Sequence, residues 1–128
     1  MRTFDIETLV REAEKASQGA RASYSKFKVG ASVLTKSGKL YTAFNIENPS
    51  LMLTMCAERI ALYKAITEED SEIVAIAVAS NSGRYCFPCG ACRQAIFEFA
   101  PRADIFIKSE RGIRKYRIEE LLPNAFRK

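Results

Sequence analysis

Hydrophobic residues recur along the chain at two different spacings, which predict helices and strands. Near-helical spacing within residues 3–20 predicts a first helix, ended by Gly19. Residues 27–35 and 40–47 alternate between apolar and polar on either side of a glycine-bearing turn, which is typical of a β-hairpin. The first part of the chain is therefore predicted to be a helix followed by two antiparallel strands.

The middle of the chain contains the continuous apolar run IVAIAVA at residues 73–79. A strand without alternation is buried on both faces, so helices are expected on both sides of its sheet. The other predicted elements are helices at 55–67, 89–99 and 118–123 and strands at 103–108 and 113–117. This order predicts a single α/β domain over residues 1–128, with three α/β/α layers and a mixed sheet of about five strands.

The helices at 55–67 and 89–99 flank strand 73–79 as successive crossover connections. Right-handed crossovers on neighbouring strands bring the amino ends of both helices to the same edge of the sheet. Cys56 and Cys89, at the starts of these helices, are therefore expected to lie close together in space.

Composition narrows the class of protein. With 128 residues, 48% apolar and 27% charged, the chain has the makeup of a globular protein with one core. The longest apolar run is too short to cross a bilayer and the charged amino terminus lacks a signal core, so we expect a cytoplasmic protein without membrane contact. The chain has no histidine, which excludes Ser-His-Asp and Cys-His catalytic units and leaves cysteine and carboxylate as metal ligands.

The formal net charge of +5 is concentrated in residues 102–128, which contain eight Lys and Arg against four Asp and Glu. The densest segment, RGIRKYR at 111–117, is compatible with a phosphate-contacting patch or with the solvated side of an edge hairpin. We favour the hairpin, because scattered basic surface residues are common and Tyr116 is the only aromatic residue among them. We therefore do not expect nucleic acid to be a partner.

Three cysteines at the predicted helix starts are candidate metal ligands. Cys89 and Cys92 have the C-x2-C spacing that suits tetrahedral zinc, and Cys56 lies at the start of the other helix. Helix amino ends lower thiol pKa values, and three thiolates on zinc leave one coordination position for water. Glu58 could take a proton from that water, and Arg59 could offset the charge of the thiolates.

Other interpretations of these residues stay open from the pattern alone. Cys86 completes a C-x2-C-x2-C run, which with Cys56 could form a closed four-cysteine zinc site or hold an iron–sulfur cluster. Pro88 argues against all three thiols of the run pointing one way, in which case Cys86 is a small buried apolar residue. Glu58 and Arg59 are also compatible with an ordinary solvated helix start.

Two motifs, CAER at 56–59 and PCGACRQ at 88–94, resemble those of the small, homotetrameric cytidine deaminases. The resemblance continues through YSKFKVGA at 24–31, NIEN at 45–48 and ELLP at 120–123, so it covers almost the whole chain. It implies a zinc enzyme that converts cytidine and deoxycytidine to uridine and deoxyuridine with release of ammonia, in pyrimidine salvage. It also implies one Zn2+ per subunit and a homotetramer.

The same resemblance assigns roles to particular residues. The implied zinc ligands are Cys56, Cys89 and Cys92. Glu58 matches the proton shuttle for the water that attacks C4 of cytosine. Asn45 and Glu47 match residues that hold a ribose hydroxyl, and the backbone of Ala57 matches a position that contacts the base. Phe27 resembles an aromatic residue that packs against the base, although a core phenylalanine would fit its pattern nearly as well.

The chain departs from the family pattern at some positions. Leu51 stands where many relatives have a tyrosine that reaches a neighbouring subunit's site. Phe126 resembles a carboxy-terminal aromatic residue that reaches a neighbour's pocket. A related deaminase acting on another aminopyrimidine nucleoside or on RNA is an alternative, but Glu47 favours a substrate with a free ribose.

Overall fold

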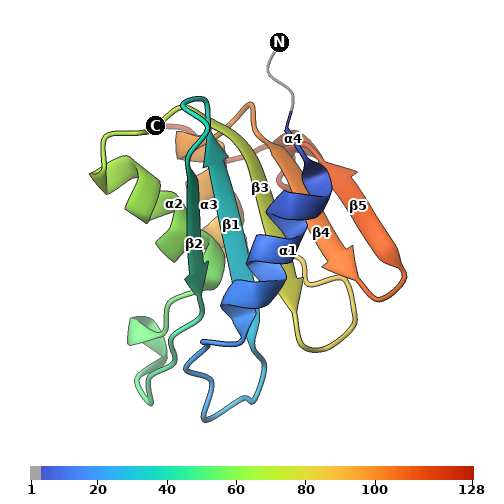
Figure 1. Cartoon of the computed structure of the whole chain (residues 1–128). Helices are drawn as coiled ribbons and strands as arrows, with labels where there is room; N and C mark the ends of the chain where they lie inside the picture. The colour runs from blue at the N-terminus through green and yellow to red at the C-terminus, as the bar shows by residue number, and fades with distance from the viewer. Residues whose placement is uncertain (1–3) are drawn as a thin grey trace.

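A five-stranded mixed sheet in the order β2-β1-β3-β4-β5 forms the middle layer of the protein (Figure 1). The computed structural model describes residues 4–128. Its elements are α1 (Ile6–Ser17), β1 (Val29–Thr35), β2 (Leu40–Phe44), the short 3-10 helix η1 (Leu51–Leu53), α2 (Ala57–Thr67), β3 (Ile73–Ser80), α3 (Gly90–Phe99), β4 (Asp104–Ser109), β5 (Gly112–Tyr116) and α4 (Ile118–Leu121). Helix α1 covers one face of the sheet, and α2 and α3 cover the other. The predicted three-layer α/β/α class is confirmed.

Strand pairing explains how the two cysteine-bearing helix starts are brought together. β1 pairs antiparallel with both β2 and β3, so β2 and β3 run in the same direction, and β3 pairs parallel with β4. Helices α2 and α3 are therefore the crossovers between β2 and β3 and between β3 and β4. The register pairs Val29, the first residue of β1, with Ser80, the last residue of β3. The loop before β1 and the loop after β3 therefore lie at the same end of these strands.

Two apolar clusters fill the spaces on either side of the sheet. One lies under α2 and α3 and includes Ile76 and Val78, and the other lies under α1 and includes Ala75 and Ala77. Successive residues of β3 thus enter opposite clusters, which confirms that this strand is covered on both faces. Both faces need apolar residues for that reason, so β3 shows no alternation.

Strand β1 is also buried along its whole length, although its sequence alternates in the manner of a half-exposed strand. The small residues Gly30 and Ser32 are buried rather than solvated on the face that packs against α1. The Ser32 hydroxyl donates a hydrogen bond of 2.5 Å to the carbonyl oxygen of Leu9. The alternation in β1 therefore comes from small residues, which let α1 approach the sheet closely. The buried hydroxyl of Ser32 is tolerated because it has a hydrogen-bond acceptor.

Substituting Gly30 by alanine is expected to lower the free energy of unfolding by about 1–3 kcal/mol, the usual cost of overpacking. A Cβ atom there would lie 2.5 Å from the backbone nitrogen of Ser17 and would clash with the carbonyl oxygen of Ala13. These are backbone atoms of α1, so the helix itself would have to move. Urea unfolding measures the change. Gly90→Ala is the matched control, since a Cβ there meets no heavy atom within 4 Å, and an equal loss in both variants would contradict the prediction.

The basic segment at 111–117 lies largely on β5, which is an edge strand of the sheet. Residues 113–115 are exposed. Asp104 on the neighbouring strand forms ion pairs with Lys115 and Arg117. Its Oδ1 atom lies 3.8 Å from Lys115 Nζ and 3.2 Å from Arg117 Nη1. The segment therefore lies on an edge hairpin, as we favoured from the sequence.

Among the helices of residues 4–128, none is long and apolar enough to cross a membrane.

Candidate active site

Cys56 and Cys89 are the residues immediately before α2 and α3, and both have extended backbone conformations. The helices begin one residue later than either cysteine, at Ala57 and Gly90, so neither thiol lies within the first helical turn. Neither side chain hydrogen-bonds to the amino end of its own helix. Both sulfur atoms are therefore available for contacts between the two helix starts.

The three candidate ligands converge. The Sγ atoms of Cys56, Cys89 and Cys92 all lie within 4.8 Å of one another, and those of Cys56 and Cys89 are 3.7 Å apart. Cys92 is fully buried, whereas Cys89 is exposed. Three converging thiols suit a soft, tetrahedral ion such as zinc, with a fourth position left open. Cys86 is not part of this ligand group within residues 4–128, which argues against a closed four-cysteine site.

The negative charge of the Cys56 thiolate is stabilised within the protein. A hydrogen bond from Cys92 and the guanidinium of Arg59 lower the pKa of Cys56 to about 5. The Nη2 atom of Arg59 donates to the Cys56 sulfur at 3.7 Å, and this hydrogen bond raises the pKa of Arg59. These contacts favour the thiolate form of Cys56, which is the form that binds metals. Arg59 occupies the place predicted for a residue that offsets the charge of the ligands.

Glu58 is the second residue of α2 and is only 4% exposed. Burial raises the pKa of its carboxyl group to about 7. Glu58 lines the same cavity as Cys56 and Cys89. A carboxyl group that titrates near neutral pH can both accept and donate a proton. Glu58 is therefore suited to general acid–base catalysis in this cavity.

The cavity beside the cysteines has a volume of about 160 Å³. Its lining comes from the loop before β1, the end of β2, the segment into α2 and the loop before α3. The lining residues are Phe27, Val29, Asn45, Thr54, Met55, Cys56, Ala57, Glu58, Cys86, Phe87 and Cys89. Most of the predicted site residues thus share one cavity, but Glu47, Arg59 and Cys92 are outside its lining.

Asn45 and Glu47 are both engaged with the loop that leads into β1. Asn45 Oδ1 accepts from the Val29 amide at 2.9 Å, and Asn45 Nδ2 donates to the Phe27 carbonyl at 2.8 Å. Glu47 accepts from the amides of Tyr24 and Ser25, both at 3.1 Å, and from the Ser25 hydroxyl. The hydrogen bonds from Ser25 hold the pKa of Glu47 below its ordinary value. Each side chain keeps unused hydrogen-bonding capacity, because an amide has a second N–H and a carboxylate has several lone pairs.

Several lining residues were missed from the sequence. Thr54 and Met55 directly precede Cys56, and Phe87 lies two residues before Cys89. Their closeness in sequence to two of the candidate ligands was the available signal. Cys86 also lines the cavity, and burial raises the pKa of its thiol to about 12. Cys86 is therefore a neutral thiol beside the cavity rather than a fourth thiolate.

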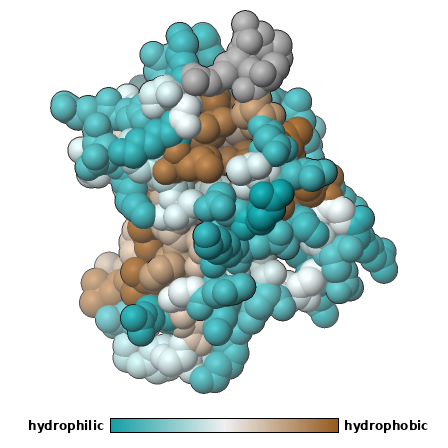
Figure 2. All heavy atoms as spheres, in the orientation of Figure 1, coloured by the Kyte–Doolittle hydropathy of each residue, from teal (hydrophilic) through white to brown (hydrophobic). Residues whose placement is uncertain are grey.

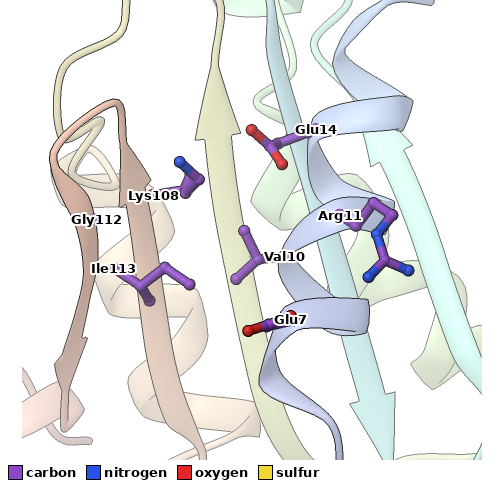
Figure 3. Close-up of a pocket in the computed structure, with 7 residues that line it drawn as sticks. All are labelled: Glu7, Val10, Arg11, Glu14, Lys108, Gly112 and Ile113. Carbon is purple, nitrogen blue, oxygen red and sulfur yellow. The ribbon is translucent and has the colours of Figure 1, made fainter.

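A second, larger hollow of about 390 Å³ lies on the other side of the sheet. Figure 3 shows that it is bounded by Glu7, Val10, Arg11 and Glu14 of α1 and by Lys108, Gly112 and Ile113 near the β4–β5 hairpin. Its charged groups are of both signs, and no cysteine lines it. The converging sulfur atoms and the buried carboxyl group make the smaller cavity the candidate active site.

Comparison with known proteins gives consistent matches over nearly the full chain. The family model described as "Cytidine and deoxycytidylate deaminase zinc-binding region" matches residues 4–108. A cytidine deaminase of Halalkalibacterium halodurans is 44% identical over 125 residues, which is 96% of this chain and 95% of that protein. The crystal structure of cytidine deaminase from Burkholderia pseudomallei has a TM-score of 0.91 and 37% identity, over 96% of this chain and 100% of that one. The crystal structure of the Mycobacterium tuberculosis cytidine deaminase has a TM-score of 0.86 and 33% identity, over 98% and 100%.

Proposed function

The chain belongs to the cytidine and deoxycytidylate deaminase family, and we propose that it hydrolyses cytidine and deoxycytidine to uridine, deoxyuridine and ammonia. The observation that carries this proposal is the buried carboxyl group of Glu58 in one cavity with Cys56 and Cys89. The resulting activity would serve pyrimidine salvage in the cytoplasm. It is the same activity that the resemblance implied from the sequence.

The donor set of the site fits zinc. Cys56, Cys89 and Cys92 would hold the ion, because their sulfur atoms converge and Arg59 compensates their charge. When bound, zinc supplies Lewis-acid chemistry that lowers the pKa of water. We expect one ion per subunit, with the three thiols as its protein ligands.

Glu58 carries the proton transfers in this proposal. Its carboxylate accepts a proton from water as the water oxygen forms a bond to C4 of the base, and it passes that proton to N3. It then accepts the second proton from the same oxygen and delivers it to the amino group, so that the C4–N bond breaks and ammonia leaves. A pKa near 7 suits both directions of transfer, because neither protonation state is strongly disfavoured at neutral pH.

The remaining predicted residues would hold the nucleoside. Asn45 and Glu47 would bind a ribose hydroxyl with the hydrogen-bonding capacity that the loop leaves free. Phe27 would pack against the base, and the backbone of Ala57 would hydrogen-bond to it. Phe27, Asn45 and Ala57 line the cavity, which supports these roles.

The direct test is to incubate the purified protein with cytidine and with deoxycytidine and to measure uridine, deoxyuridine and ammonia. Zinc is assayed on the same sample. Parallel reactions with a cytosine-containing RNA oligonucleotide and with a different aminopyrimidine nucleoside test the alternative substrates. Zinc without any deamination would favour a zinc-binding module, and deamination of the oligonucleotide alone would favour an RNA substrate.

We also propose a homotetramer, which accounts for the apolar side chains on the surface. Figure 2 shows hydrophobic surface at the lower left, in the region of η1. In this short helix Leu51 is 85% and Met52 is 94% exposed. On the face formed by α2 and α3, Tyr63 and Phe99 are exposed and meet edge to face, with ring centroids 6.1 Å apart. Exposed apolar surface of this kind marks an interface with another chain.

Light scattering at assay concentrations is expected to give four times the 14.4 kDa mass of one chain. The expected interface includes α2 and buries apolar side chains from each subunit, since obligate interfaces are more apolar than the rest of the surface. A monomer that is fully active at the same concentration would contradict this prediction.

A further inference from the structure

Arg93, on α3, bridges two segments that lie far apart in the sequence. Its Nε atom donates to the carbonyl oxygen of Pro88 at 2.7 Å, and its Nη1 atom donates to the carbonyl oxygen of Leu121 at 2.6 Å. Pro88 directly precedes the candidate ligand Cys89, and Leu121 is the last residue of α4. One guanidinium therefore joins the turn that carries Cys89 to the carboxy-terminal segment.

Both carbonyl groups accept a hydrogen bond from the guanidinium of Arg93. Pro88 is among the most deeply buried residues of the protein. The Leu121 carbonyl belongs to the last turn of a helix, where carbonyl groups lack partners within the helix. A buried carbonyl without a donor is costly, so loss of the guanidinium favours movement of both segments. Arginine suits this place because its planar group presents several donors in a fixed arrangement.

Gln94 offers a comparison within the same helix. Its Nε2 atom donates to the carbonyl oxygen of Phe126 at 3.1 Å. Consecutive side chains of α3 thus bind the main chain of the carboxy-terminal segment at residues 121 and 126. Of the two hydrogen-bonding side chains, only that of Arg93 also reaches the turn before Cys89.

We propose that Arg93 is a positioning residue that holds Cys89 in place for the metal and couples metal binding to the docking of residues 121–126. The coupling is reciprocal, because two processes linked through one group influence each other equally. Metal binding should therefore order residues 121–126, and their docking should slow the release of the metal. This inference uses the zinc site of the proposed function, but it does not require that the enzyme be active.

The test compares Arg93→Ala, Arg93→Lys and Gln94→Ala in the full chain loaded with zinc. The rate of zinc transfer to a competing coloured chelator is measured, and amide hydrogen exchange of residues 118–128 is followed with and without zinc. We expect Arg93→Ala to release zinc roughly tenfold faster, within the range typical of groups that support metal ligands, and to lose the zinc-dependent protection of residues 121–126. Arg93→Lys should be intermediate, since lysine keeps the charge but lacks the planar fork.

Gln94→Ala is the matched control, and it should loosen residue 126 while releasing zinc at the parent rate. A merely structural role for Arg93 would lower the melting temperature of the metal-free protein and leave the effect of zinc on residues 121–126 unchanged. That result, or release of zinc by Arg93→Ala at the parent rate, would overturn the proposal. If Arg93→Ala does not fold, Arg93→Lys decides by the same two readouts.

The outcomes also separate this inference from the proposed function. A parent protein that holds zinc but does not deaminate cytidine would refute the proposed function and still give both readouts. A parent that deaminates cytidine while its Arg93 variants keep zinc as tightly as the parent does would refute only the role of Arg93. A parent that binds no zinc would refute both.

Discussion

Glu58→Gln is expected to reduce the turnover of cytidine by roughly 10²–10⁴-fold, the usual contribution of a positioned acid–base group. Glutamine keeps the size of the side chain, but it cannot take a proton from water. The loss should appear in kcat because the same group is used in several proton transfers. Zinc content and the melting temperature should be nearly unchanged, since Glu58 is outside the group of three thiols. Steady-state kinetics and a zinc assay on one preparation measure both quantities.

Cys86→Ala is the matched comparison for this variant, because Cys86 lines the same cavity without belonging to the ligand group. We expect it to be metal-loaded and active. A closed four-cysteine site predicts the reverse, with loss of metal in Cys86→Ala and no effect of Glu58→Gln. An active Glu58→Gln enzyme would remove Glu58 from the mechanism.

Glu47→Ala is expected to reduce kcat/KM for cytidine by about 10–100-fold while zinc stays bound. The estimate follows from the loss of a hydrogen bond to a charged group, which contributes about 1.5–3 kcal/mol. The effect should depend on the ribose hydroxyls of the substrate. Activity on 2′,3′-dideoxycytidine, which lacks the 2′ and 3′ hydroxyls, should therefore change much less than activity on cytidine. Kinetics of both enzymes on both substrates give the coupling between Glu47 and the sugar.

Ser25→Ala separates binding of the sugar from support of the loop. Glu47 also holds the loop at Tyr24 and Ser25, so its removal disturbs that loop as well. Ser25→Ala removes only the hydroxyl partner and leaves the carboxylate in place. Equal losses in Ser25→Ala and Glu47→Ala on both substrates would assign Glu47 to the loop alone.

The fold could be predicted well from the sequence where the hydrophobic pattern of an element reflects the burial of its faces. β3 is an example, because burial on both faces requires apolar residues at every position and the run 73–79 has them. The convergence of Cys56 and Cys89 could also be predicted, since handedness rules fix where successive crossovers begin. These features depend on periodicity and topology rather than on individual contacts.

Other features depend on contacts between residues distant in sequence, which a pattern does not record. No element was predicted at residues 51–53, where η1 lies, because a single turn of helix has no periodicity to recognise. The helix starts were placed at or before the cysteines, since the residue before a helix and its first residue differ in backbone conformation rather than in type. The burial of the polar positions of β1 could not be predicted from the strand itself, because it depends on α1 packing against them.

The candidate site was assembled from both kinds of information. Spacing and helix position alone indicated a thiol site with a nearby carboxylate, but they left the four-cysteine alternative open. The roles given to Phe27, Asn45, Glu47 and Ala57 came from family resemblance, and they remain proposals. The link from Arg93 to Leu121 had no sequence signal, because its partners are main-chain carbonyl groups that any residue provides.

The position of β5 at the edge of the sheet bears on how the protein avoids aggregation. An edge strand exposes unpaired N–H and C=O groups that can recruit a strand from another molecule. Here the exposed positions of that strand include Arg114 and Lys115, whose like charges would meet those of a second copy. Strand addition at this edge is therefore disfavoured by repulsion and by the cost of desolvating the cations. We therefore expect this edge to stay unpaired even when the protein is concentrated.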